Sequence, residues 1–455
     1  MLFYEYSFIF LFLPATLTVH FLLPASARNG WLFLTSCVFY SASSLAFLPI
    51  LLLSVALDYL LGRSIHQAAS LRARKAWLCA SVALNLGLLG FFKYAGLITR
   101  TLSDLTGSSV IPVLDVPLPV GISFYTFQSM SYTIDIFRGQ ASPARSLVDF
   151  GAFVTLFPQL IAGPIVRYDQ MDRELRDRRV SVDGFAEGAR FFVLGLAKKI
   201  LLADSAAALA DPLFALQEPG FCAAWASVLL YSFQIYFDFS GYSDMAVGLG
   251  KMIGFEFPQN FNSPYKATSF SDFWKRWHMT LSRWLRDNLY VPLGGNRQGP
   301  VRTQWNLLLT MLLGGLWHGA SWNYLVWGAY HGGLLALERA LGTRNVLLRL
   351  PCPARAVIVF VCVSVGWVFF RCGDLAHSVV WLGALLSPGT LGASISWNTW
   401  VTCILLLGIV WLMKNSWEWK ARFGWPENAL VTCGFIASVV VALGKGSSPF
   451  LYFQF

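Results

Sequence analysis

A histidine inside an apolar stretch is the residue of this chain best suited to do chemistry. His318 stands in the sequence Leu312-Leu-Gly-Gly-Leu-Trp-His-Gly-Ala-Ser-Trp-Asn-Tyr324, between apolar runs long enough to lie in a lipid bilayer. Ionisable groups at membrane depth are costly and are usually functional. Glycines on both sides of His318 allow another segment of chain to approach closely. The alternative role for His318 is an interhelical hydrogen bond in a polar core.

Acyl transfer to a hydroxyl is the reaction that such a histidine suits. A hydroxyl is a poor nucleophile at pH 7, and a neutral imidazole can take its proton as it attacks a thioester. Burial favours the neutral imidazole, which is the form that a base needs. His318 is therefore the candidate general base. Asn323 and the indole of Trp317 are supporting candidates, because their N–H groups can stabilise a developing oxyanion.

Two other histidines and three carboxylates leave alternatives open. His278, in Phe273-Trp-Lys-Arg-Trp-His-Met-Thr-Leu-Ser282, is either a second active-site histidine or a polar member of an interfacial helix. His331 precedes two glycines, which favours close helix packing over a role in the site. The carboxylates in apolar segments either accept hydrogen bonds from Tyr, Ser and Trp side chains or form a proton or ion relay. These carboxylates are Asp135, Asp238 and Asp244, of which Asp238 is a further supporting candidate.

Several common kinds of site have no support in the sequence. The eight cysteines show no Cys-x-x-Cys spacing and no histidine at metal-ligand spacing, so neither a disulfide framework nor a metal site is expected. The chain has no Gly-x-x-x-x-Gly-Lys loop, no Gly-x-Ser-x-Gly elbow and no His-Glu-x-x-His motif. Nucleotide hydrolysis, serine hydrolysis of the soluble type and zinc-protease chemistry are therefore not indicated.

The elements that must position these residues are membrane helices. Of the 455 residues, 56% are hydrophobic and only 13% are charged, against roughly a quarter in soluble domains. The apolar runs predict an all-α, polytopic membrane protein of about 10–12 transmembrane helices. We expect one integral-membrane domain over residues 1–455, with its core motifs at about 117–341. The net charge of +10 is a signal of membrane topology and does not indicate nucleic-acid binding.

Three segments depart from a simple spanning pattern. Residues 119–138 carry hydroxyls, Gln128 and Asp135, so this segment should line a protein interior or a cavity. Residues 157–167 are broken by two prolines and a glycine, which predicts a re-entrant or interfacial segment. Residues 251–304 interleave basic and aromatic side chains, which is typical of a stretch at the cytoplasmic membrane interface.

Taken together, these motifs resemble the membrane-bound O-acyltransferase (MBOAT) family. They are most similar to its bacterial branch that acetylates alginate, with proteins of teichoic-acid D-alanylation as more distant cousins. The most specific segments are Asn262–Ser282 and Gly315–Asn323. The resemblance also covers Pro119–Arg138, Phe157–Arg167, Tyr236–Gly248 and the terminal Pro449-Phe-Leu-Tyr-Phe-Gln-Phe455.

The resemblance implies a site and a donor. His318 matches the catalytic histidine of the family, and His278 matches the second family histidine. The fold would be a ring of helices around a thinned centre, in which an outward-facing funnel meets a cytoplasmic tunnel at the histidine. The donor would be cytoplasmic acetyl-CoA, a substrate rather than a bound cofactor. The basic side chains Lys275, Arg276 and Arg283 would lie on the donor side, where they can hold its phosphates.

The resemblance also implies a location and partners. The chain would be a multi-pass protein of the bacterial inner membrane that contacts its lipids. It would pass acetyl groups across the membrane to an exported polysaccharide, either directly or through a periplasmic acetyltransferase resembling SGNH hydrolases. Two alternatives remain open at this point. One is a binding or transport protein for acylated lipids or polysaccharides that makes no bonds, and the other is an acyltransferase with a lipid, protein or teichoic-acid acceptor.

Overall fold

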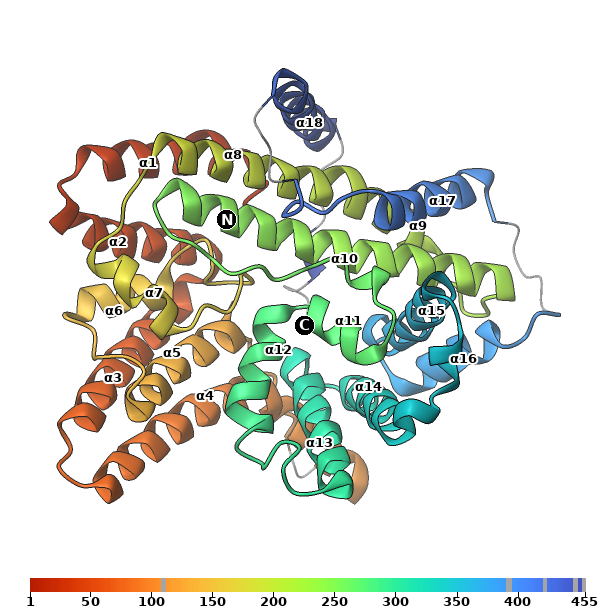
Figure 1. The fold of residues 1–455 in the computed structure, drawn as a ribbon, viewed down its shortest axis with the longest axis horizontal. Helices are drawn as coiled ribbons and strands as arrows, with labels where there is room; N and C mark the ends of the chain where they lie inside the picture. The colour runs from red at the N-terminus through yellow and green to blue at the C-terminus, as the bar shows by residue number, and fades with distance from the viewer. Residues whose placement is uncertain (108–111, 390–394, 420–423, 445–448, 452–455) are drawn as a thin grey trace. The chain divides into compact units, whose positions relative to one another are not determined.

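The computed structural model describes residues 1–107, 112–389, 395–419, 424–444 and 449–451, and the regular structure in these ranges is entirely helical (Figure 1). The predicted all-α class is thus confirmed. The described residues pack as two compact units with interleaved sequences. The first comprises Met1–Phe192 and Tyr242–Pro258, and the second comprises Val193–Gly241 and Gln259–Phe455. The expected single domain stays a prediction.

Four described segments are long and apolar enough to cross a membrane, which confirms the membrane character of the chain. They are Ala25–Gln67, Leu71–Thr106, Cys352–Arg371 and Trp425–Gly444. Three shorter apolar helical segments lie at Ser7–Leu22, Leu375–Leu385 and Trp397–Leu412. The predicted 10–12 spans are more numerous because the prediction also counted these shorter helices and helices with many polar side chains. The first long segment contains two helices, since a 3₁₀ turn at Leu45–Phe47 interrupts it.

The first unit consists of helices that come mainly from the N-terminal part of the chain. They are α1 (Leu13–Leu22), α2 (Ala25–Ser44), α3 (Leu48–Gln67), α4 (Leu71–Thr106), α5 (Ile122–Arg138), α6 (Leu147–Thr155) and α7 (Tyr168–Arg176). Two longer helices, α8 (Val182–Ala197) and α10 (Phe221–Met252), have residues in both units.

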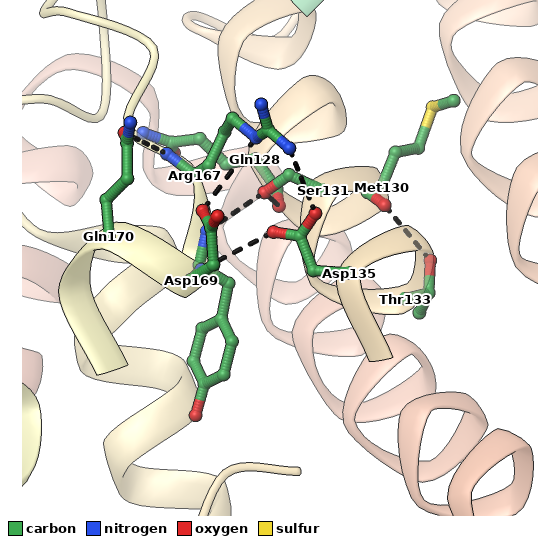
Figure 2. Close-up of polar contacts among 9 residues, drawn as sticks. Gln128, Met130, Ser131, Thr133, Asp135, Arg167, Asp169 and Gln170 are labelled. Carbon is green, nitrogen blue, oxygen red and sulfur yellow. Dashed lines mark hydrogen bonds and ion pairs between the residues drawn. The ribbon is translucent and has the colours of Figure 1, made fainter. Parts of the chain in front are cut away.

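The polar helix α5 lies in the interior of the first unit, as its hydroxyl-rich sequence predicts. Fourteen of its residues are buried, among them Gln128 and Asp135. Figure 2 shows that Asp135 faces the loop before α7. Its Oδ1 lies 3.5 Å from Nη2 of Arg167, and its Oδ2 accepts a hydrogen bond from the backbone N–H of Asp169 at 3.4 Å. The expected acceptor role holds, although the partners are a guanidinium and a backbone N–H rather than Tyr, Ser or Trp.

The segment at 157–167 has no regular helix and is buried in the first unit. Several of its polar groups find partners within the unit. The side-chain amide of Gln159 donates to the carbonyl of Phe153 at 2.7 Å, and the N–H of Phe157 donates to Ser36 Oγ at 3.0 Å. Irregular backbone of this kind is tolerated in a membrane protein where protein surrounds it. The break in regular structure that the prolines and glycine predict is thus present, and the re-entrant or interfacial placement stays a prediction.

The second unit contains both candidate histidines. Its helices are α9 (Asp204–Phe214), α11 (Phe270–Arg276), α12 (Met279–Leu285), α13 (Pro300–His318), α14 (Trp322–Leu341), α15 (Cys352–Arg371), α16 (Leu375–Leu385), α17 (Trp397–Leu412) and α18 (Trp425–Gly444). A π-helical segment, η3 (Lys198–Ala203), joins α8 to α9. In Figure 1 the short helices α11 and α12 lie beside α13 and α14.

The basic-aromatic stretch at 251–304 differs from the expected interfacial helix. Its described part beyond residue 258 folds as short helices and turns, and large aromatic side chains in it are buried. Trp277 and Phe273 are each 1% exposed. These two aromatic side chains therefore pack inside the protein, and the location of the stretch at the membrane interface stays a prediction. A stretch without one regular helix can turn its aromatic residues inward while Lys275 stays exposed.

Helices α13 and α14 form a hairpin whose close contact depends on glycine. A Cβ added at Gly315 would lie 2.2 Å from the carbonyl oxygen of Tyr324 and 3.2 Å from Cα of Gly328. This backbone approach leaves no room for a methyl group, so only glycine fits. The hairpin turns at 319–321, directly after His318. The close approach that the glycines predict is thus the contact between α13 and α14.

Gly315→Ala is expected to separate the two helices and to lower the free energy of unfolding by about 1–3 kcal/mol, the usual cost of overpacking. Thermal unfolding of the detergent-purified protein measures this effect. Gly333→Ala is the matched control, because a Cβ there meets no atom within 4 Å. Equal melting temperatures for the two variants would contradict the close contact.

Candidate active site

His318 is the last residue of α13, and aromatic side chains enclose its ring. The residue is 6% exposed. The ring centroids of Trp317, Trp327 and Phe370 lie 5.0, 5.3 and 5.2 Å from that of the imidazole. Gly319 follows in extended conformation, and Ser321 caps α14 by accepting a hydrogen bond from the N–H of Asn323. The helix end and the packing of the rings therefore fix the position of the imidazole.

His278 lies in the turn between α11 and α12, where its backbone is unusual. Its φ is 42° and its ψ is 54°, in the left-handed region that non-glycine residues rarely adopt. The residue is 1% exposed, and its Nδ1 lies 3.1 Å from Oδ1 of Asn260. Burial lowers the pKa of His278 from 6.5 to about 3. The imidazole is therefore neutral at physiological pH.

Trp317 brings the two histidines into one cluster. Its ring centroid lies 6.0 Å from that of His278 and 5.0 Å from that of His318. The side chain is 4% exposed, so a buried indole packs against two imidazoles that are 40 positions apart in the sequence. Trp317 thus packs against both predicted histidines, of which only His318 lines the adjacent cavity.

A cavity of about 370 Å³ opens onto His318. Most of its wall is apolar, with the side chains of Trp274, Met279, Leu281, Leu285, Leu307, Met311, Trp327 and Leu335. Lys275, Arg283 and Arg286 also line it, whereas none of the described residues in its wall is acidic. Lys275 and Arg286 are exposed, and His318 is buried. The cavity therefore leads from a cationic rim to the imidazole.

Lys275 and Arg283 differ from the neighbouring cations in having no ion-pair partner among the described residues. Arg286 is paired with Asp287, at 2.8 Å between Nε and Oδ1. Arg276 is likewise paired with Asp272 at 2.8 Å, and it does not line the cavity. Of the three predicted donor-side cations, the structure therefore places Lys275 and Arg283 at the cavity and Arg276 outside its wall.

Two supporting candidates have other partners. The side-chain amide of Asn323 donates to the carbonyl of Cys372 at 2.7 Å and to Ser378 Oγ at 3.2 Å. Both N–H groups of that amide are thus committed to holding α14 against α15 and α16, which leaves none for an oxyanion. Asp238 lies outside the cavity wall, where its Oδ1 is 2.7 Å from Nζ of Lys199.

His331 and several unpredicted residues complete the surroundings of the site. The ring of His331 packs against those of Trp274 and Trp327, with centroids 5.2 and 4.9 Å away. This agrees with the expectation of close packing. Sequence reasoning missed Trp327, Phe370 and Asn260, because ordinary aromatic residues and a lone asparagine carry no chemical signal without their neighbours.

Comparison with known proteins places this site in a family. Residues 140–370, which include both histidines, match the membrane-bound O-acyltransferase family. A probable alginate O-acetylase, AlgI, of Pseudomonas aeruginosa is 47% identical over 86% of the chain and 76% of the relative. The Pseudomonas putida protein of that name is 40% identical over the whole of both chains.

More distant relatives differ in what their names say they modify. A peptidoglycan O-acetyltransferase of Helicobacter pylori is 34% identical over 98% of the chain and 96% of its own length. Teichoic acid D-alanyltransferases match less of the chain. The Streptococcus thermophilus protein is 29% identical over 49% of the chain and 57% of its own length. The family model matches about half of the sequence, and the similarity to the alginate O-acetylase of Pseudomonas putida covers the whole chain. The chain belongs to the membrane-bound O-acyltransferase family.

Proposed function

We propose that the chain transfers acetyl groups from cytoplasmic acetyl-CoA to an exported polysaccharide, with His318 as the general base. The observation that carries the proposal is the cavity with His318 in its wall and cations at its rim. Its volume of about 370 Å³ is within the usual range for small-molecule sites, roughly 300–1,000 Å³. The O-acetylase and O-acetyltransferase names of the relatives support acetyl as the transferred group.

The shape and charge of the cavity fit a thioester of coenzyme A. The apolar wall suits the acetyl group and the pantetheine arm. The phosphates of the donor are anionic, and Lys275 and Arg283 supply the charge-assisted hydrogen bonds that phosphates accept. A donor placed in this way has its carbonyl near the imidazole and its nucleotide end at the exposed rim.

The reaction then needs a base and an acceptor hydroxyl. His318 takes the proton of an acceptor hydroxyl as the oxygen attacks the thioester carbonyl. The new C–O bond forms and the C–S bond breaks, and the proton on His318 passes to the sulfur that leaves with coenzyme A. The enclosing rings of Trp317, Trp327 and Phe370 exclude water, which would otherwise hydrolyse the thioester. The acceptor is the polysaccharide itself or a periplasmic partner protein resembling SGNH hydrolases.

Turnover of acetyl-CoA separates this proposal from a binding or transport protein that makes no bonds. The purified protein in lipid nanodiscs should release the thiol of coenzyme A when acetyl-CoA and a polysaccharide acceptor are both present. Acetyl-CoA that binds but is not consumed, with every candidate acceptor, would contradict enzymatic function. Turnover with a D-alanyl thioester instead of acetyl-CoA would contradict the proposed donor.

Lys275→Ala combined with Arg283→Ala is expected to raise the KM for acetyl-CoA about 10²-fold or more, because each lost charge-assisted hydrogen bond is worth roughly 1.5–3 kcal/mol. The kcat should change less, since neither side chain touches the reacting atoms. Initial rates across a range of acetyl-CoA concentrations measure both constants. Arg276→Ala is the matched control, because its guanidinium pairs with Asp272 outside the cavity wall. An unchanged KM in the double variant would show that the donor binds elsewhere.

A further inference from the structure

Asn260 occupies the position from which a side chain can orient His278. It is 1% exposed and lies in the irregular segment between α10 and α11. Its Oδ1 accepts hydrogen bonds from the backbone N–H of Thr280 at 3.2 Å and from the Thr280 hydroxyl at 2.9 Å. The same oxygen lies 3.1 Å from Nδ1 of His278. One buried amide thus contacts both sides of the turn that carries the histidine.

The contacts of Asn260 determine which of its atoms faces the histidine. A backbone N–H can only donate, so the atom that faces the N–H of Thr280 must be the amide oxygen and not the amide nitrogen. That oxygen has no proton to give. Nδ1 of His278 must therefore be the donor in their contact, and a neutral imidazole with its proton on Nδ1 has its lone pair on Nε2.

The backbone around the turn is braced by the same segment. The N–H of Met279 donates to the carbonyl of Asn260 at 2.8 Å, and the N–H of Asn262 donates to the carbonyl of Arg276 at 2.9 Å. These bonds hold His278 in its left-handed conformation, which persists only where the surroundings enforce it. Such strain occurs preferentially at functional sites.

The electrostatic surroundings of His278 keep the imidazole neutral. The rings of Phe239, Phe261 and Trp317 lie 4.7, 6.4 and 6.0 Å from it between centroids, and none of them is charged. Burial is the cause that lowers its pKa to about 3. An aspartate in the orienting position, as in a Ser-His-Asp triad, would stabilise an imidazolium. The uncharged amide of Asn260 orients the ring without doing so.

We infer that Asn260 is a positioning residue that holds His278 as the neutral Nδ1–H tautomer, so that Nε2 serves the reaction as a hydrogen-bond acceptor. The inference rests on the proposed function. It excludes an oxyanion-binding role for His278, because the only N–H of the ring is already donated to Asn260. It leaves His278 to accept a hydrogen bond from another donor of the bound acceptor, while His318 takes the proton of the attacking hydroxyl.

Asn260→Asp tests the inference, because aspartate keeps the shape and the acceptor oxygens but adds a negative charge. An opposite charge at hydrogen-bond distance raises the pKa of a histidine by about 1–3 units. In wild type the imidazolium of His278 forms only near pH 3, so its neutral form is present throughout the neutral range. In the variant, protonation at higher pH removes the acceptor. The variant should therefore show an added loss of rate at about pH 4–6, where His278 of the wild type stays neutral.

Two further variants separate positioning from folding. Asn260→Ala should lower kcat about 10²-fold, within the range that positioned acid–base groups contribute, and leave the KM for acetyl-CoA unchanged. Thr280→Val is the control, because it removes one hydrogen bond of Asn260 and leaves the bond to His278. A kcat that falls as far in Thr280→Val as in Asn260→Ala would overturn the inference. A wild-type pH–rate profile in Asn260→Asp would also overturn it.

A measurement without turnover keeps the inference testable if the proposed function fails. Nitrogen-15 NMR of histidine-labelled protein distinguishes a protonated ring nitrogen from one that carries a lone pair, and His278→Gln assigns the signals. Wild type should show His278 protonated at Nδ1 alone. Protonation at Nε2 would overturn the inference even in an active enzyme, whereas an inactive enzyme with the expected tautomer would count only against the proposed function.

Discussion

His318→Ala is expected to lower the rate of acetyl transfer by about 10²–10⁴-fold, the usual contribution of a positioned general base. The variant keeps the cavity and its cations, so acetyl-CoA should still bind. What it loses is the group that takes the proton from the acceptor hydroxyl. Release of coenzyme A by protein in nanodiscs measures the rate. The O-acetyl content of polysaccharide from cells that depend on this chain provides a second measurement.

The loss must be separated from damage to the fold. The imidazole packs against three aromatic rings, and alanine leaves a space among them. His318→Gln fills more of that space and also lacks a base. Both variants should therefore lose the rate of acetyl transfer to a similar extent, while the glutamine variant keeps a melting temperature closer to that of the wild type. His66→Ala controls for loss of a histidine, since His66 is exposed at the end of α3. Wild-type rates in a folded His318→Ala protein would show that the base is another group.

The sequence predicts the helical class and the individual candidate site residues better than it predicts how those residues are arranged in space. Apolar runs and hydroxyl patterns depend on neighbours along the chain, so the buried α5 and the irregular segment at 157–167 are both foreseeable. The meeting of His278 and His318 around Trp317 depends on the packing of helices that are far apart in the sequence. No periodicity encodes that contact. Resemblance to the family motifs was needed to place both histidines in one site.

The sequence could not show which basic side chains point into the cavity where the donor is proposed to bind. Lys275 and Arg276 are neighbours on α11, and consecutive residues of a helix point about 100° apart. One of them therefore lines the cavity, whereas the other turns toward Asp272. The sequence marks both as basic residues in an aromatic stretch. Only the orientation of a seven-residue helix distinguishes them.

Lys199→Met is expected to lower the free energy of unfolding by about 3–5 kcal/mol, the cost of removing one partner of a buried ion pair. Lys199 is 1% exposed, and its Nζ lies 2.7 Å from Asp238 Oδ1 and 2.8 Å from Asp204 Oδ1. Methionine leaves Asp238 as a buried charge without its cation. The change also removes the contact of the ammonium with the ring of Phe450, whose centroid lies 4.8 Å away. Thermal unfolding in detergent measures the loss.

A second substitution shows whether the effect comes from the uncompensated charge. Lys199→Met with Asp238→Asn should recover much of the lost stability, because the double variant buries no unpaired carboxylate at that position. The amide oxygen that Asp238→Asn introduces can still accept the hydrogen bond that Leu451 N–H donates to the carboxylate in wild type, at 2.9 Å. Lys198→Met is the matched control, since the neighbouring ammonium bonds the Ser416 hydroxyl at 2.6 Å. Equal losses from Lys198→Met and Lys199→Met would mean that the lysine stems, and not the buried ion pair, stabilise this part of the second unit.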